Sequence, residues 1–287
     1  MSSSSALAVV FLIISAAWVS AMPVTIQPIA DGFVRSGSPT TSVNSSALME
    51  LAARNGPWDR KIYLKYNLTG LLADGREASN ARLSLALASQ GTRLLGTEAG
   101  QVELALYGIA DNDDAWAENV VTWNNAPHND TASGTLLTPG AVLLAKVKVD
   151  SSRVNSLDRI TWSSHELAQY LNWAVGLRGQ RYVTGQGSDS DRKVTFVITV
   201  SNVGTSVPGF ILQRRQAGAD VAPLLQFDDL PPVASDNSLQ NDHFSVTLGG
   251  DHSVVVREKA SGAEARFTPR FQVIRRTSSP GFSTAAL

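Results

Sequence analysis

The sequence predicts an all-β protein: an antiparallel, jelly-roll-like β-sandwich with one short helix and a partial β-segment at the C-terminus. Short runs of alternating apolar and polar residues recur along the chain, and clusters of Gly, Asn, Asp, Ser and Pro separate them. Alternation with a period of two indicates strands with one buried face, and the clusters are typical of turns. Many short strands joined by turns favour a sandwich over an α/β fold.

Four runs show the alternation most clearly. Their apolar positions are Ile62, Leu64 and Tyr66; Leu83, Leu85 and Leu87; Val102, Leu104 and Leu106; and Val194, Phe196, Ile198 and Val200. In the first run Lys61, Tyr63 and Lys65 alternate with the apolar set, so we expect them on the face opposite the core. A register shift of one residue would instead bury Tyr63 and expose Tyr66.

One segment predicts a helix that packs against an end of the sandwich. Ser163 and Glu166 have the spacing of a capping box, in which side chains satisfy free backbone amides of the first turn. Gly176 can end the helix in a left-handed conformation. The residues expected on the buried helix face are Leu167, Tyr170, Leu171 and Ala174.

The N-terminus predicts export. Residues 6–18 are an apolar run that fits a signal peptide and is too short to span a bilayer. Val19-Ser20-Ala21 places small residues where a signal peptidase would cut after Ala21, so residues 1–21 are the expected signal peptide. No Lys or Arg precedes the run, which leaves an uncleaved anchor or a misassigned start as the alternative. The remainder is expected to be extracellular and outside the membrane.

The mature chain divides into three parts. Residues 22–230 carry most strand signals and are the expected sandwich domain. Residues 231–240 contain a Pro-Pro pair followed by small polar residues, which indicates a linker. Residues 241–287 contain about three strand signals, too few for an independent domain. We therefore interpret them as the start of a second β-domain or as an extension of the first. The final residues, Ser-Thr-Ala-Ala-Leu, carry no strong signal.

The composition excludes several classes of function. The formal net charge of −1 argues against a nucleic-acid partner, which requires a basic surface. There is no cysteine, which excludes disulfides, thiolate metal sites and cysteine nucleophiles. The four histidines form no metal-spaced pair, and there is no G-x-S-x-G elbow or phosphate-binding Gly-rich loop. Paired catalytic carboxylates depend on distances that a sequence does not reveal.

Five segments together resemble a known family. They are 30–38 (ADGFVRSGS), 59–71 (DRKIYLKYNLTGL), 80–85 (NARLSL), 113–127 (DDAWAENVVTWNNAP) and 210–227, which resembles the family's last pair of strands. In this order they are similar to the DNRLRE-type domain, a group that includes carbohydrate-binding module family 96. Segment 80–85 is short, and segment 113–127 is the most specific of the five. The resemblance covers about residues 25 to 230. Gln213-Arg214-Arg215 replaces the family's S-R-E, which puts transfer of function at that position in doubt.

The resemblance implies a β-sandwich and a non-catalytic binding role. Characterised members of the carbohydrate-binding family are similar in binding alginate and in being attached to enzymes that degrade polysaccharides. The expected partners are therefore an acidic polysaccharide such as alginate and a covalently attached catalytic domain. The wider group also includes spacer and adhesive modules of exported bacterial proteins.

A polyuronate carries a carboxylate on each sugar, so its binding site needs positive charge beside an aromatic ring. Exposed lysines are more often merely solvated, and a loop tryptophan can fold back onto the sandwich. Trp116, Trp123, Trp162 and Trp173 are expected in packing roles, and Asn124 and Asn125 in holding a turn. The predicted carbohydrate-binding residues are Arg35, Trp58, Arg60, Lys61, Tyr63, Lys65 and Arg214.

A metal site is a weaker expectation. Asp111, Asp113 and Asp114 resemble the start of a calcium loop, but Ala115 and Trp116 occupy the next positions and break the EF-hand pattern. No cofactor is required, and structural calcium built from this loop and distant residues is left open.

Three hypotheses follow. The first is a module that binds an acidic glycan, with salt-sensitive affinity. The second is a structural or adhesive spacer without glycan affinity. The third is the N-terminal part of a polysaccharide lyase or glycoside hydrolase whose catalytic part lies after residue 235 or outside this chain.

Overall fold

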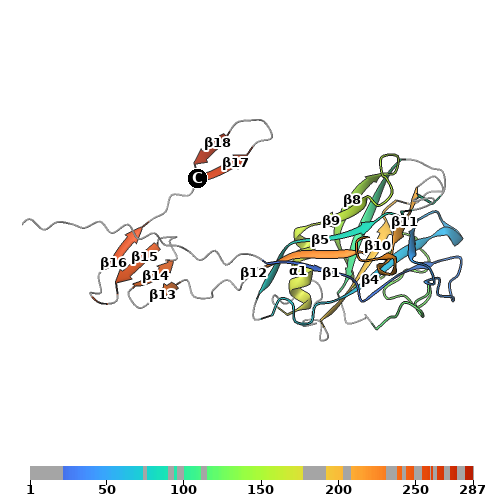
Figure 1. Ribbon diagram of the computed structural model, residues 1–287, viewed down its shortest axis with the longest axis horizontal. Helices are drawn as coiled ribbons and strands as arrows, with labels where there is room; N and C mark the ends of the chain where they lie inside the picture. Colours follow the sequence, from blue (N-terminus) through green and yellow to red (C-terminus); the bar gives the residue numbers. More distant parts are fainter. Residues whose placement is uncertain are drawn as a thin grey trace, which may run out of the picture. The chain divides into compact units, whose positions relative to one another are not determined.

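The structure is a computed structural model of the chain (Figure 1). It describes residues 22–73, 76–89, 94–95, 100–110, 115–176, 192–202 and 208–230, and, further along, 238–240, 244–248, 254–258, 260, 264–267, 272–276 and 282–286. The chain forms two compact units, Met1–Pro231 and Pro232–Leu287. The predicted signal peptide lies outside the described residues, as does most of the predicted linker.

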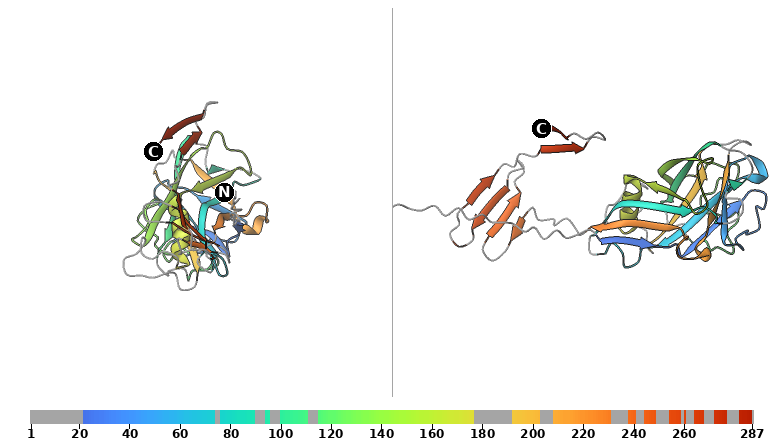
Figure 2. Two further views of the ribbon diagram at one scale, coloured as in Figure 1. Left: turned by 90° about the vertical axis from the view of Figure 1, so that its left-hand side faces the viewer. Right: turned by 45° about the horizontal axis from the view of Figure 1, so that its top comes forward.

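The first unit is an antiparallel sandwich, which confirms the predicted fold class (Figures 1 and 2). The four-stranded sheet has the order β1 (Met22–Ile26), β12 (Leu224–Leu230), β5 (Glu77–Ala86), β9 (Arg159–Ser163). The five-stranded sheet has the order β2 (Ala30–Arg35), β4 (Arg60–Asn67), β10 (Lys193–Val200), β7 (Gln101–Ile109), β8 (Ala141–Asp150). A small sheet of β3 (Leu48–Leu51), β11 (Gly209–Gln213) and β6 (Leu94–Leu95) completes the unit.

The main core contains the apolar residues that the alternation assigned to the inner face. Ile62, Leu64 and Tyr66 of β4 are all fully buried in it, so the expected register of this strand is confirmed. Their neighbours come from the other predicted runs on β5, β7 and β10 and from β12. In a pleated strand every second side chain points to the same face. The inner faces of the two large sheets are therefore apolar at every second residue.

The helix α1 (His165–Ala174) packs against β5, β8 and β10. Leu167, Tyr170, Leu171 and Ala174 are buried as predicted. The cap differs by one residue from the prediction: the side chain of Ser164, not Ser163, accepts a hydrogen bond of 2.9 Å from the Leu167 amide. Ser163 is instead the last residue of β9. Gly176 follows with a φ of 86°, as expected for a left-handed helix end.

The second unit contains two antiparallel sheets. One is formed by β13 (Ser238–Gln240), β14 (Phe244–Leu248), β15 (Val254–Glu258) and β16 (Glu264–Phe267), and the other by β17 (Gln272–Arg276) and β18 (Phe282–Ala286). β13 begins inside the predicted linker, and β18 occupies the stretch where the sequence carried no signal. A helix long and apolar enough to cross a bilayer is absent from the described residues.

Candidate functional site

The strand that was expected to carry an open basic stripe is buried on both faces. Lys61 and Tyr63 have no exposed surface and Lys65 is 8% exposed, so the expectation that they face solvent was wrong. The reason is residues 115–140, here called the cover segment, which lie over the outer face of β2, β4 and β10. Tyr63 packs there with Trp116, Trp123 and Val197 in a second apolar cluster.

Each of the two lysines lies against a tryptophan of the cover segment. The Lys61 Nζ is 4.9 Å from the centroid of the Trp123 ring, and the Lys65 Nζ is 5.0 Å from that of Trp116. Lys61 also donates to the Asn129 Oδ1 at 2.7 Å, and Lys65 donates to the Trp116 carbonyl at 2.6 Å. Desolvated cation–π contacts of this kind favour the charged amine, so these lysines anchor the cover segment to the sheet.

The Lys61 amine makes further hydrogen bonds to the cover segment. Beyond Asn129, its amine donates to the backbone carbonyls of Asp130 at 3.1 Å and Leu136 at 2.6 Å. Burial nevertheless lowers its pKa to about 8, against the opposing attraction of Asp130 and Asp59. A group held this way is committed to the fold and is not accessible to a polymer.

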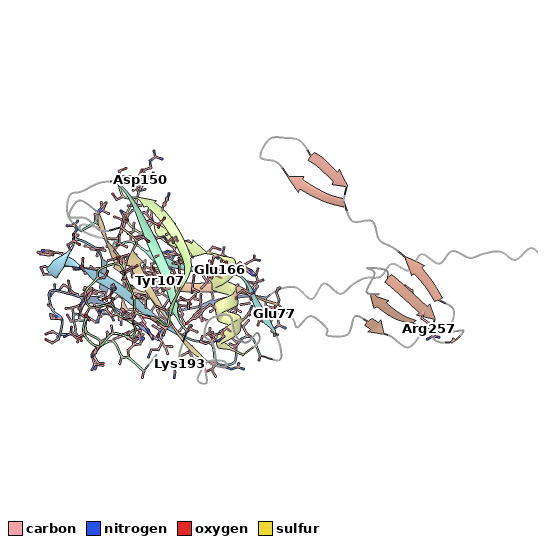
Figure 3. All side chains as sticks on the ribbon, turned by 180° about the vertical axis from the view of Figure 1, so that it is seen from behind. Glu77, Tyr107, Asp150, Glu166, Lys193 and Arg257 are labelled. Atoms are coloured by element: carbon pink, nitrogen blue, oxygen red, sulfur yellow. The ribbon has the colours of Figure 1, made fainter. Side chains whose placement is uncertain are left out.

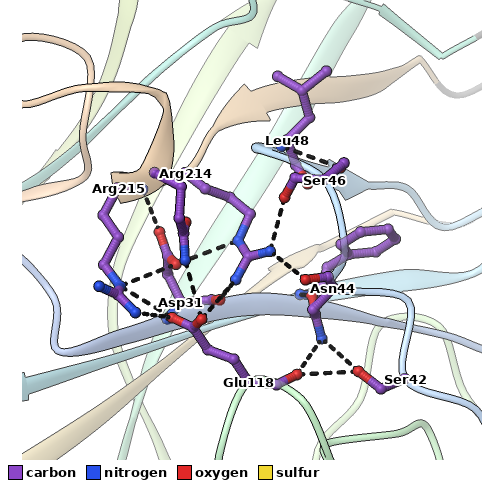
Figure 4. A network of polar contacts seen from close by, with 10 residues as sticks. Asp31, Ser42, Asn44, Ser46, Leu48, Glu118, Arg214 and Arg215 are labelled. Carbon is purple, nitrogen blue, oxygen red and sulfur yellow. Dashed lines mark hydrogen bonds and ion pairs between the residues drawn. The ribbon is translucent and has the colours of Figure 1, made fainter.

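Arg214 is also buried, which contradicts its assignment as a glycan-binding residue. It is 1% exposed, and its guanidinium donates to the carbonyls of Asn44 and Ser46, both at 2.8 Å (Figure 4). The same group forms ion pairs with Asp31 at 3.3 Å and Glu118 at 3.1 Å. Since Arg214 is in contact with β2, the β2–β3 loop and the cover segment, its role is to hold three distant parts of the chain together.

Two carboxylates complete this network. The Asp31 amide donates to Glu118 at 2.9 Å, and the Arg215 side chain donates to Glu118 at 2.8 Å. Burial raises the pKa of Asp31, although the Arg215 amide and the Arg214 charge oppose the shift. For Glu118, burial is outweighed by hydrogen bonds from Asp31 and Arg215, which lower its pKa. Arg215 therefore belongs to the same network as Arg214.

The exposed part of the predicted site is the loop that carries Trp58. Trp58 is 59% exposed at the end of a short 3-10 helix, η1 (Gly56–Trp58). The Asp59 carboxylate closes this loop by accepting hydrogen bonds from the amides of Arg54 at 2.8 Å and Asn55 at 3.0 Å. The Asp59 amide donates in turn to the Ser36 Oγ at 3.1 Å. Because its base is held by these bonds, the loop presents the indole ring outward in a fixed position.

Arg60 supports the ring from the protein side. Its guanidinium carbon is 5.4 Å from the Trp58 ring centroid, and its Nη1 donates to the Trp58 carbonyl at 2.7 Å. Arg60 is itself only 4% exposed and is paired with Glu50, so it positions Trp58 and does not reach solvent. The sequence offered no signal for Glu50, because its contact with Arg60 depends on how β3 and β4 come together.

Arg35 lies at the same end of the sandwich, opposite Arg60 in the β2–β4 register. It is half-buried, and one of its nitrogens donates to Ser38 at 2.8 Å. Its Nε is buried without a hydrogen-bond partner among the residues that the structure describes, so only the rest of its half-buried side chain is open to solvent. Of the seven predicted binding residues, only Trp58 and Arg35 therefore lie where a ligand could reach them.

A comparison with protein-family models identifies the part of the chain to which these residues belong. Residues 22–152 match the model of carbohydrate-binding module family 96. The protein carries a domain of this family. The match ends just after β8, whereas β9, β10, β11 and β12, which complete the three sheets, follow it in the chain.

A second comparison finds a similarity of part of the chain to a named protein. The chain is 31% identical over 99 residues to a protein named gellan lyase from a Bacillus species. The matched segment is 31% of this chain and 4% of that protein. The similarity is therefore confined to one small part of a much longer protein.

The module's most specific motif, in the cover segment, has a structural role. Trp116 donates its indole hydrogen to Thr195 at 2.9 Å, and Trp123 donates to the Thr131 carbonyl at 3.0 Å. Asn125 holds the adjacent turn, as expected, by accepting from the Thr122 amide at 2.6 Å and donating to the Val120 carbonyl at 3.1 Å. Asp111, Asp113 and Asp114 lie outside the described residues, so a calcium site there stays a prediction. The described residues contain no group of three side chains suited to a metal ion.

Proposed function

We propose that the protein binds an acidic polysaccharide, of the alginate or gellan kind, without cleaving it, and that Trp58 is the main contact. The exposed and rigidly held indole ring carries this proposal. An aromatic face that is 59% exposed and fixed from behind by Arg60 can stack on the apolar face of a sugar ring with little loss of conformational freedom.

The charge at this end of the sandwich favours a uronate over a neutral sugar. The half-buried Arg35 lies opposite Arg60 in the β2–β4 register, and Arg54, also half-buried, lies beside the Trp58 loop. A carboxylate on the sugar next to the stacked ring could bind to an arginine here, since guanidinium groups match carboxylates in shape and charge. The family match to a carbohydrate-binding module and the distant similarity to gellan lyase support the same class of ligand.

The proposal also places the chain outside the cell, in a protein that acts on or adheres to polysaccharide. The apolar run at residues 6–18 supports export. N-terminal sequencing of the secreted protein is expected to give Met22 as the first residue. A product that retains residues 1–21 would contradict cleavage after Ala21.

Affinity electrophoresis of the full chain through gels containing alginate, pectate, gellan or a neutral glucan tests the binding role. We expect retardation by at least one acidic polymer and not by the glucan. Trp58→Ala should weaken this binding by about five- to thirty-fold, the range for loss of a central aromatic contact. The matched control is Leu143→Ala, which removes another exposed apolar side chain, on β8. Equal mobility in every gel would favour the spacer function instead.

A further inference from the structure

The outer face of the four-stranded sheet has a hollow of its own, away from the Trp58 loop. It holds about 290 Å³ and crosses β1, β12 and β5, which lie side by side in Figure 2. A second hollow of about 460 Å³ continues from it towards β9 and α1, and Asn80 lines both. Neighbouring strands are about 4.8 Å apart, so a ligand that crosses all four strands would span roughly 14 Å.

Arg82 is the cation that lines the first hollow. It lies on β5, its side chain is exposed, and it lines the first hollow. Within the described part of the chain, no hydrogen bond or ion pair engages its guanidinium group. Most other arginines of the sandwich, among them Arg60, Arg76, Arg159 and Arg214, are bound to carboxylates or carbonyls. Arg82 therefore offers its donors to a ligand without first losing an internal contact.

A β-bulge lies next to Arg82, at Asn80. The β5–β12 register shifts between Gln226 and Asp228, and Asn80 at this point has a φ of 49°. Asn80 and Arg82 are two residues apart and both exposed, as strand alternation requires, while Ala81 between them is buried in the core. Asparagine tolerates a positive φ better than most residues, which explains its presence here.

The polar groups beside Arg82 are held in place before any ligand arrives. Asn80 donates to the Asp228 carboxylate at 2.7 Å, and Gln226 donates to the Thr25 Oγ1 at 3.2 Å. Amide, hydroxyl and carboxylate groups in such an array can exchange hydrogen bonds with sugar hydroxyls, and the guanidinium can receive a carboxylate. At the α1 end of the face the charges are acidic: Glu77 lines the second hollow, and Glu166 lies on α1 (Figure 3). An anionic sugar would therefore bind at the Arg82 end.

We propose that this face is a second glycan-binding surface, which holds a uronate carboxylate on Arg82 and the neighbouring hydroxyls on Asn80, Gln226 and Asp228. The inference rests on the proposed function, since it assigns a second surface to the same class of ligand. With two surfaces, one protein molecule could bind two segments of one polymer, or two polymers, at the same time. Simultaneous binding at both surfaces would increase the avidity for the polysaccharide.

Amide and indole NMR of the isotope-labelled full chain, titrated with tetrasaccharides of alginate and of pectate, tests the second surface separately from the first. Shifts of the Arg82, Asn80 and Gln226 signals on addition of a uronate would support the inference. Shifts confined to the Trp58 indole and its loop would overturn it and leave the proposed function intact. No shifts at either surface would overturn both. Equal shifts at Arg82 with cellotetraose would overturn the assignment of an acidic ligand.

Two variants strengthen this test. Arg82→Gln should weaken binding at the second surface by about ten-fold or more, the effect of losing a charge-assisted hydrogen bond, and leave the Trp58 shifts unchanged. Asn80→Gly keeps a backbone suited to the positive φ and removes only the amide, so it should weaken binding there by a few-fold. The control is Lys148→Gln, which removes a charge from an exposed site on β8. An effect of Lys148→Gln as large as that of Arg82→Gln would mean unspecific attraction and overturn the assignment.

Discussion

At the scale of single residues, the basic side chains that the sequence places on β4 lie inside the fold. Lys61 and Lys65 alternate with core residues, as the pattern predicts, but the cover segment takes the place of solvent on their face. A strand pattern indicates which residues share a face and does not indicate what covers that face. The partner of Lys61 is more than 60 residues away in the chain, so no local signal could have found it.

Lys61 predicts a specific dependence of stability on pH. Its pKa is about 8 in the folded state and 10.5 when unperturbed. Between these values the unfolded chain retains a proton that the folded chain has lost, so the contribution of Lys61 to stability rises with pH. Relative to Lys61→Met, the free energy of unfolding should rise by about 3 kcal/mol between pH 7 and 10.5. Urea denaturation followed by tryptophan fluorescence reports on the first unit, since residues 232–287 contain no tryptophan.

The comparison with Lys61→Met removes the effect of Tyr66, whose pKa is raised by burial and which both proteins retain. Parallel pH curves for the two proteins would contradict the account of Lys61. If Lys61→Met does not fold, an NMR titration of the Lys61 side chain in the unaltered protein measures its pKa directly. A value near 10.5 would be the contradicting result.

Arg214 predicts a large loss of stability, because its removal leaves the buried carboxylate of Asp31 with only the longer ion pair, of 3.6 Å, to the more exposed Arg215. Arg214→Met should destabilise the first unit by about 3–5 kcal/mol, the usual cost of breaking a buried ion pair from one side. Arg215→Met is the matched control: its side chain is 37% exposed, and we expect a loss of about 1 kcal/mol. Urea denaturation measures both. Similar small losses in the two variants would show that Arg214 does not hold the network together.

At the scale of secondary-structure elements, the strands and the helix could be predicted because their patterns are local. The capping position was less certain, since Ser163 and Ser164 are adjacent and both precede the helix. Ser164→Ala should cost about 1 kcal/mol of stability through loss of the N-cap. Ser163→Ala should cost less, since Ser163 makes only a hydrogen bond of 3.2 Å to the Ala81 carbonyl. The reverse order in a denaturation experiment would favour the capping box read from the sequence.

The bulge in β5 is the element that the sequence pattern concealed. The alternation of Leu83 and Leu85 was clear, but the inserted residue at Asn80 changes which side chains turn outward before it. A strict period of two places Asn80 and Arg82 on one exposed face, but it does not predict that Ala78 and Ala81, three residues apart, are both buried. The position of Trp58 was easier to predict from the sequence. Trp58 follows Gly56-Pro57, and such a loop is where a binding aromatic is expected.

At the scale of the whole molecule, different residues of the sandwich serve packing and candidate ligand binding. Its most specific motif joins the cover segment to the five-stranded sheet, and its candidate binding groups are the few that this packing leaves exposed. Five of the seven residues chosen from the sequence are instead buried, including every one on β4. Charge in the sequence was a poor guide to the site, because in this fold most of the charge is paired inside the protein.

Isothermal titration calorimetry of the full chain with alginate, at low and at high salt and beside a neutral glucan, tests the central claim most directly. Binding by charge and stacking predicts saturable binding to alginate that weakens as salt screens the charges, and no binding to the glucan. If titration with alginate gave no heat of binding, and titrations with pectate and gellan under the same conditions gave none either, the account would be contradicted. Binding to the neutral glucan that is as strong as to the acidic polymers would also contradict it.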